Sequence, residues 1–124
     1  MAGPISAAPL EGVLALQLFE VLGKFGSTRR KGMILKYRDG RRRALGECRV
    51  GVDPAKEYTW PMELWLPDQG RHKSSYPVSS YFDISIVDES SPLELGCDQP
   101  DYWRRYEMRG TLELCTIKGW SLKL

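Results

Sequence analysis

The apolar positions between residues 10 and 25 recur at intervals of three and four. They are Leu10, Val13, Leu14, Leu18, Val21, Leu22 and Phe25. This spacing places the side chains on one face of an α-helix, and Gly26 directly after the run is a typical helix stop. The pattern predicts an amphipathic helix of about four turns.

Much of the remaining chain alternates between apolar and polar residues, which is typical of half-buried strands. The predicted strands cover residues 33–37, 44–50, 58–66, 81–87 and 112–124. Asp39-Gly40 is a strong hairpin signal between the first two strands. Gly46 indicates a bulge, Asp53-Pro54 a turn, and Lys118-Gly119 a bend in the last strand. Pro61 indicates that the strand over 58–66 lies at a sheet edge or has an irregular start.

A second, shorter helix is predicted over residues 100–110, with Pro100 at its start and Gly110 at its end. Residues 1–9 are small residues with two prolines, and we expect them to form a flexible N-terminal arm. Residues 10–124 have the length of one domain. The predicted fold class is α+β, with the N-terminal helix and the short C-terminal helix packed on a mainly antiparallel sheet of five or six strands.

Charge is distributed unevenly along the 124 residues, although the net charge is only +2. Residues 24–49 hold ten Lys or Arg residues against Asp39 and Glu47, a net charge of +8. The remainder holds eight basic and fourteen acidic residues, a net charge of −6. The near-neutral total therefore does not argue against binding of a polyanion.

The residues with catalytic or metal-binding chemistry form few recognisable patterns. Cys48, Cys97 and Cys115 contain no CxxC pair, which disfavours a disulfide framework and a structural zinc site and indicates a reducing compartment. His72 is the only histidine, and the sequence has no GxSxG, HExxH or glycine-rich phosphate loop. We expect a protein that is not an enzyme and needs neither a metal ion nor a cofactor.

The basic residues form two clusters on either side of the first hairpin strand. The candidate site residues are Arg29, Arg30 and Lys31 before the strand, and Arg41, Arg42 and Arg43 after the turn. Such clusters favour a polyanion-binding face, whose ligand is either anionic lipid or nucleic-acid phosphate, over a merely solvated surface. Tyr37 is the only aromatic residue between the clusters. This separation of cations from aromatic rings disfavours base stacking but not phosphate binding.

Several local strings follow one another in an order that resembles a known family. They include a helix around 13–21, a strand ending in Leu66-Pro67, the string 84–90 running into an acidic turn, and the C-terminal residues Asp101-Tyr102, Arg104, Arg105, Gly110, Leu112-Glu113 and Gly119-Trp120-Ser121-Leu122. In this order they resemble the folded core of rhabdovirus matrix proteins. The sequence has neither a PPxY nor a PTAP motif, so the resemblance does not extend to recruitment of host budding factors.

The resemblance implies a non-enzymatic viral matrix protein that self-associates, binds an anionic lipid membrane surface through the basic clusters and bridges it to the viral nucleocapsid. It implies that Ile5 and Leu10 dock into a neighbouring subunit, and that the protein occupies the virion, the host cytoplasm and the inner face of the host membrane. The alternatives are a small nucleic-acid-binding viral regulator, which binds RNA, and a structural subunit of a larger complex.

Overall fold

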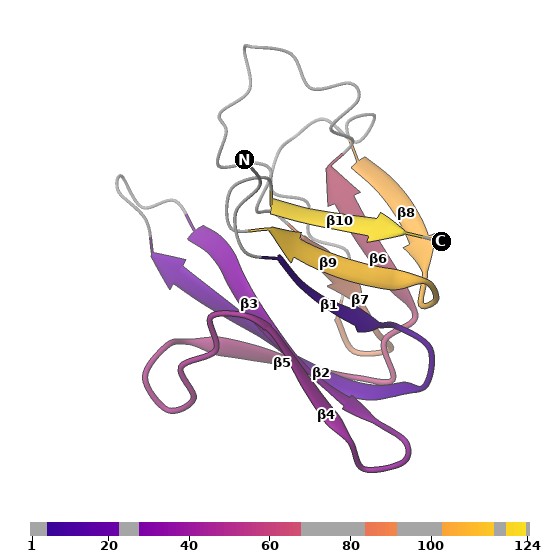
Figure 1. The fold of residues 1–124 in the computed structure, drawn as a ribbon, viewed down its shortest axis with the longest axis horizontal. Coiled ribbons are helices and arrows are strands. Elements are labelled where there is room, and N and C mark those ends of the chain that lie inside the picture. Colours follow the sequence, from indigo (N-terminus) through magenta and orange to yellow (C-terminus); the bar gives the residue numbers. More distant parts are fainter. Residues whose placement is uncertain (1–4, 23–27, 68–83, 92–102, 116–118, 124) are drawn as a thin grey trace.

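The computed structural model describes residues 5–22, 28–67, 84–91, 103–115 and 119–123. Every regular element in these ranges is a β-strand. The strands are β1 (Ile5–Pro9), β2 (Val13–Leu22), β3 (Thr28–Tyr37), β4 (Arg42–Gly46), β5 (Ala55–Thr59), β6 (Glu63–Pro67), β7 (Ser85–Val87), β8 (Trp103–Glu107), β9 (Thr111–Cys115) and β10 (Gly119–Lys123). The predicted α+β fold class is therefore wrong, because the described chain is all-β (Figure 1).

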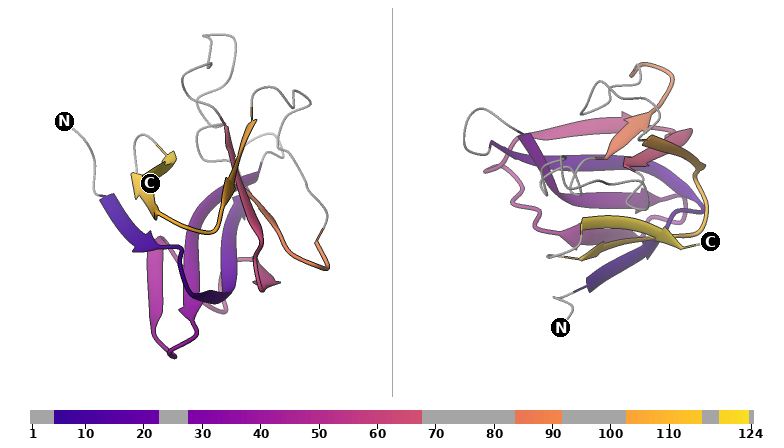
Figure 2. Two further views of the ribbon diagram at one scale, coloured as in Figure 1. Left: turned by 90° about the vertical axis from the view of Figure 1, so that its right-hand side faces the viewer. Right: turned by 90° about the horizontal axis from the view of Figure 1, so that it is seen from above.

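The strands form three antiparallel sheets. Sheet A has the order β1-β9-β10, sheet B the order β4-β3-β2-β5, and sheet C the order β7-β6-β8. Figure 1 and the left view of Figure 2 show sheet B at the bottom of the molecule, with sheets A and C above it. Apolar side chains from all three sheets meet in one core, to which Leu35, Leu64 and Leu112 each contribute a fully buried side chain. Burial of this core is the main favourable term in folding.

Strand β2 replaces most of the predicted helix over residues 10–25. Its register with β3 skips one residue between Val13 and Ala15, which places a β-bulge at Leu14. The extra residue leaves Val13 and Leu16 both buried although they are three positions apart. A bulged strand therefore reproduces a spacing of apolar residues that is typical of a helix.

Strand β2 is also buried on both faces. Leu16 and Leu18 belong to the core, whereas Phe19 is 1% exposed and lies opposite Gly32 on the other face of sheet B. The carbonyl of Glu47 and the thiol of Cys48 come so close to Gly32 that no Cβ would fit there. The chain after β4 thus covers the face on which Phe19 lies. Two-sided burial produces a continuous apolar run, which hides the two-residue period.

The second predicted helix, over residues 100–110, is also wrong where it is described. Trp103–Glu107 form β8, which pairs antiparallel with β6. Arg105 Nη1 donates to Glu63 Oε2 across this pair at 2.8 Å, so the strands are also joined by an ion pair. Pairing with β6, a strand some forty residues earlier in the chain, thus decides the extended conformation of residues 103–107. Residues 100–102 of the predicted helix lie outside the described residues.

The predicted hairpin between β3 and β4 is confirmed, with Gly40 at φ 90° in its turn. Strand β4 ends at Gly46, however, and does not continue to residue 50. The predicted strand over 58–66 is interrupted at Trp60-Pro61-Met62, and its halves, β5 and β6, belong to different sheets. The prolyl nitrogen of Pro61 cannot donate a ladder hydrogen bond, which agrees with a break at this point.

Both ends of the described chain belong to sheet A. Residues 5–9 of the expected flexible arm form β1, whose register with β9 places Ile5 opposite Cys115. The predicted single strand over 112–124 is instead two strands, β9 and β10, that pair with each other. Strand β7 begins at Ser85, and residues 81–83 of the strand predicted there lie outside the described residues.

Candidate anion-binding surface

The predicted basic clusters lie at opposite ends of the β3–β4 hairpin. Lys36 stands opposite Arg42, whereas Gly32 stands opposite Gly46. The stretch from Arg30 to Lys36 spans six residues of strand, about 20 Å at a rise of roughly 3.3 Å per residue. The six candidate site residues therefore do not form one continuous patch.

The first cluster is engaged in ion pairs within the fold. Arg30 Nε lies 3.3 Å from Glu20 Oε1. Lys31 Nζ lies 2.7 Å from Asp53 Oδ2 and 3.3 Å from Glu47 Oε2, and the hydrogen bond to Asp53 is the main reason that the pKa of Lys31 is raised. These contacts tie the chain after β4 to β3. The backbone of Arg29 lies in β3, and its side chain is outside the described residues.

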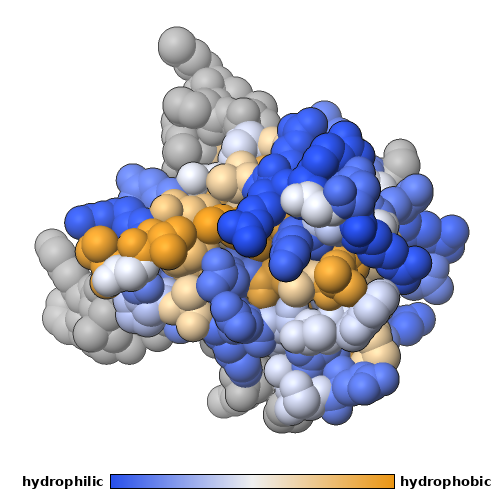
Figure 3. Space-filling model, turned by 90° about the horizontal axis from the view of Figure 1, so that it is seen from below, coloured by the Kyte–Doolittle hydropathy of each residue, from blue (hydrophilic) through white to orange (hydrophobic). Residues whose placement is uncertain are grey.

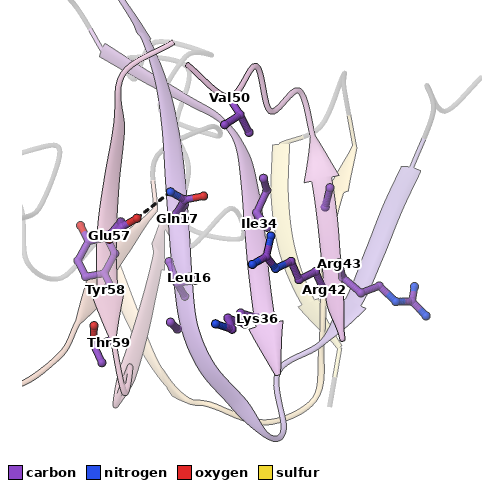
Figure 4. Close-up of a pocket in the computed structure, with 12 residues that line it drawn as sticks. Leu16, Gln17, Ile34, Lys36, Arg42, Arg43, Val50, Glu57, Tyr58 and Thr59 are labelled. Atoms are coloured by element: carbon purple, nitrogen blue, oxygen red, sulfur yellow. Dashed lines mark hydrogen bonds between the residues drawn. The ribbon is translucent and has the colours of Figure 1, made fainter. Parts of the chain in front are cut away.

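The second cluster is exposed, but its members point in different directions. Arg41 Nε lies 2.7 Å from Asp39 Oδ2 in the hairpin turn. The hydrogen bond from the Arg41 backbone, followed by that from its side chain, keeps the pKa of Asp39 below its usual value. Figure 4 shows Arg42 turned over the outer face of sheet B and Arg43 turned away from it. Arg43 Nη1 donates to the carbonyl of Ala7 on β1 at 3.2 Å.

A groove of about 590 Å³ lies across the outer face of sheet B. Lys36 and Arg42 line one side of it, and Gln17 donates to Glu57 at 2.8 Å on the other (Figure 4). Apolar residues that also line the groove are Ile34, Ala44 and Val50. Figure 3 views the molecule from below, on the side of sheet B, and shows an apolar band ending against a strongly hydrophilic region. The groove therefore combines a cationic side with an apolar floor.

Trp60 places an aromatic ring beside the cations, which the separation in sequence had disfavoured. The Arg38 guanidinium lies 5.1 Å from the centroid of the Trp60 ring, within the range of a cation–π interaction. Arg38 N donates to the Gly12 carbonyl and Trp60 N donates to the Leu14 carbonyl, at 3.0 and 2.8 Å. Both residues thus lie against the start of β2. The positive charge and the exposed ring form one surface only because β3 and β5 flank β2.

The segment that carries Trp60 is exposed and strained. Trp60 and Met62 are 51% and 50% exposed, which is unusual for large apolar side chains outside a contact surface. Trp60 also has φ 53°, in the left-handed region that a bulky residue rarely adopts. Strained residues of this kind persist where their surroundings hold them, and they cluster at functional sites. Sequence analysis indicated an irregularity at Pro61 but did not indicate its exposure or its neighbours.

The buried carboxylate of Asp88 holds this segment in place. Asp88 is 5% exposed, and its Oδ2 accepts from Thr59 N at 3.0 Å. Its Oδ1 accepts from Ser90 N at 2.9 Å and from Ser91 N at 2.7 Å. Burial by itself raises the pKa of Asp88, but these hydrogen bonds together outweigh it and the pKa lies below its usual value.

The residues expected to mediate self-association have different positions. Leu10 is 1% exposed and belongs to the core, and its backbone N donates to the Gly110 carbonyl at 2.9 Å. A side chain buried in this way is not available to a neighbouring subunit. Ile5 lies in β1 opposite Cys115, and its side chain is outside the described residues.

Known proteins do not extend this description. No family model matches the chain, and comparison with curated proteins and with solved structures gives no significant match. Within the described ranges, no group of three or more His, Cys, Asp or Glu side chains could hold a metal ion. In the same ranges, no helix is long and apolar enough to cross a membrane. The candidate site therefore rests on geometry and charge.

Proposed function

We propose that this protein is a non-enzymatic viral matrix protein that binds the anionic inner face of a host membrane, self-associates there and bridges the membrane to the nucleocapsid. The supporting observation is a group of exposed cations around the turn end of the hairpin, of which Arg41, Arg42 and Arg43 also line one hollow of about 250 Å³ beside Glu11 and Tyr37. The group consists of Lys36, Arg38, Arg41, Arg42 and Arg43. We call it the hairpin-end surface. The resemblance to rhabdovirus matrix proteins supports the proposal only through its strand strings and the ending Gly119-Trp120-Ser121-Leu122. The helix around 13–21 is strand β2, and the helix of the C-terminal string is strand β8 where it is described.

The charge of the hairpin-end surface suits weak, multivalent binding. A basic residue close to an anionic membrane contributes about 1 kcal/mol, so the five cations contribute at most about 5 kcal/mol. That corresponds to a dissociation constant of roughly 0.2 mM, before the opposing charges of Asp39 and Glu11 are counted. A single copy therefore binds weakly, and assembly into an array multiplies the affinity through avidity. Self-association is for this reason part of the proposal.

Flotation with vesicles that contain phosphatidylserine tests the proposal. We expect the wild-type protein to float at low salt and to dissociate as ionic strength rises, because exposed charges are screened over about 8 Å at physiological salt. The double variant Lys36→Glu/Arg42→Glu should lose flotation. Absence of wild-type flotation at low salt would overturn the proposed function.

A matched control separates the hairpin-end surface from net charge. Arg109→Glu/Lys123→Glu changes the net charge by the same amount, at two exposed residues outside sheet B that are paired with Glu107 and Glu113. We expect this control to float like the wild type. An equal loss of flotation in both double variants would show that net charge, and not the hairpin-end surface, governs binding.

The stacked pair Arg38–Trp60 favours one second candidate, a single-stranded RNA-binding protein. Exposed aromatic rings beside cations are stacking platforms for bases, worth about 1–3 kcal/mol per base. Fluorescence anisotropy with a labelled oligonucleotide in the absence of lipid tests this candidate. It predicts tight binding that weakens steeply with salt and is lost in Trp60→Ala.

A further inference from the structure

We propose that Trp60 and Met62 form an apolar anchor that enters the interfacial layer of an anionic membrane while the adjacent arginines hold lipid phosphates. The inference rests on the proposed membrane function and deepens it. It proposes that penetration into the membrane is made by two apolar residues that do not belong to the basic clusters. We call this pair the Trp60–Met62 anchor.

The exposure of the anchor is built into the backbone. Trp60 N donates to the Leu14 carbonyl and Met62 N donates to the Val87 carbonyl, both at 2.8 Å. Thr59 N is held by Asp88 Oδ2. These three hydrogen bonds satisfy the backbone on both sides of Pro61, so both side chains can enter an apolar layer without exposing unpaired donors. The positive φ of Trp60 is maintained by the same contacts.

Charge at the anchor identifies its partner as an anionic bilayer. Arg38 lies over the Trp60 ring, and Arg41 and Arg42 follow in the adjacent hairpin turn and the start of β4. Trp residues prefer the headgroup level of a membrane, where one edge of the ring is in apolar and the other in polar surroundings. A guanidinium over the ring can contact a phosphate at that level, because its donors lie in the plane of the group. The apolar and cationic groups thus match the two layers of one surface.

A second exposed apolar residue provides a contrast. Val52 is 63% exposed, more than Trp60 and Met62. The cations beside it lie close to its neighbour Asp53, since Lys31 Nζ is 2.7 Å and Arg49 Nε is 4.0 Å from Asp53 Oδ2. Exposure alone would therefore favour Val52, whereas exposure beside the Arg38 guanidinium favours the Trp60–Met62 anchor. Val50 lines the groove with Lys36 and Arg42 and is for this reason not used as a control.

Trp fluorescence in vesicles with brominated acyl chains tests insertion directly. Trp103 and Trp120 are only 5% and 2% exposed, and Trp65 Nε1 donates to Glu63 at 3.3 Å. We expect wild-type emission to be quenched by brominated phosphatidylserine vesicles and the quenching to disappear in Trp60→Phe. The affinity for vesicles measured by flotation should weaken about 70-fold in Trp60→Ser/Met62→Ser, the factor implied by losing roughly 100 Å² of apolar contact at about 25 cal/mol per Å². It should be unchanged in Val52→Ser.

The outcomes distinguish this inference from the proposed function. If the wild type floats but its emission is not quenched, or if Trp60→Ser/Met62→Ser floats like the wild type, the anchor is wrong and electrostatic membrane binding stands. If the wild type does not float, the proposed membrane function fails first. Quenching of Trp60 by an oligonucleotide, without quenching by the brominated vesicles, would overturn the anchor in favour of RNA stacking.

Discussion

Replacing Asp88 should test how the fold presents Trp60. Its two carboxylate oxygens have different tasks. Oδ1 accepts from the backbone N–H groups of Ser90 and Ser91, and Oδ2 accepts from Thr59 N, directly before Trp60. In Asp88→Ala these three backbone donors and the Ser90 hydroxyl, which donates to Oδ1 at 3.2 Å, lose their partner. In Asp88→Asn the side-chain oxygen can keep the Oδ1 bonds, whereas the amide group cannot accept from Thr59.

The magnitude follows from the burial of these donors. An unsatisfied buried donor costs about 1–3 kcal/mol. Ser91 is buried, whereas Thr59 and Ser90 are exposed and their hydrogen bonds to Asp88 are only partly buried. We therefore expect Asp88→Ala to lower the free energy of unfolding by about 1–3 kcal/mol, and Asp88→Asn, which loses chiefly the Thr59 bond, by less than half as much. In both variants the backbone beside Trp60 loses the hydrogen bond from Thr59 N that holds it to residue 88.

Urea denaturation of the wild type and both variants between pH 7 and pH 2 measures these effects. The pKa of Asp88 is lowered in the folded state, so its contribution is full above the unfolded pKa of about 3.9 and is lost as pH falls through the lower folded pKa. The stability difference between wild type and Asp88→Asn should therefore shrink below about pH 4. Equal stability of wild type and Asp88→Ala at pH 7, within about 0.5 kcal/mol, would refute the reasoning.

Three further predictions concern packing and strain. In thermal melts, Gly46→Ala should lower the stability by more than about 2 kcal/mol, because Gly46 has φ 70° and an added Cβ would collide with Leu114 and the β3 backbone. The control Gly40→Ala, where φ is 90° but the space is open, should lower it by about 1 kcal/mol. Equal losses of stability in the two variants would contradict the collision. Leu10→Ala should lower the free energy of unfolding by about 2–5 kcal/mol. Light scattering on the folded fraction should show no change in oligomeric state, and loss of oligomers at unchanged stability would restore the expected docking role. Trp60→Gly should relieve backbone strain and raise stability by about 1 kcal/mol relative to Trp60→Ala while both lose vesicle binding; if the glycine variant proves the less stable, the strain argument fails.

Local signals along the chain identified one hairpin turn and one strand break correctly. Asp39-Gly40 predicted the β3–β4 hairpin because glycine tolerates the positive φ that the turn requires. Pro61 predicted an irregular point in the strand over 58–66, and the chain breaks there between sheets B and C. These features depend on the conformational preferences of one or two residues, so a partner elsewhere in the chain is not needed to predict them.

The conformation of β2 and β8 could not be obtained in the same way. The bulge at Leu14 and the buried position of Phe19 gave residues 13–22 the apolar spacing of a helix. Residues 103–107 owe their extended form to pairing with β6, including the ion pair of Arg105 with Glu63. Whether a segment becomes a strand depends on neighbours that are distant in sequence, and intrinsic β-propensity is weak beside such packing.

The sequence by itself determined the hairpin turn and the concentration of charge in residues 24–49. Only the tertiary structure decided which of these charges remain available. Glu20, Glu47 and Asp53 come from separate segments to neutralise Arg30 and Lys31, while Trp60 is brought beside Arg38. Whether a charged side chain or an exposed ring can bind a ligand depends on the groups within a few ångströms of it, because electrostatic and packing energies fall off over that distance. In an antiparallel sheet that distance is set by long-range register.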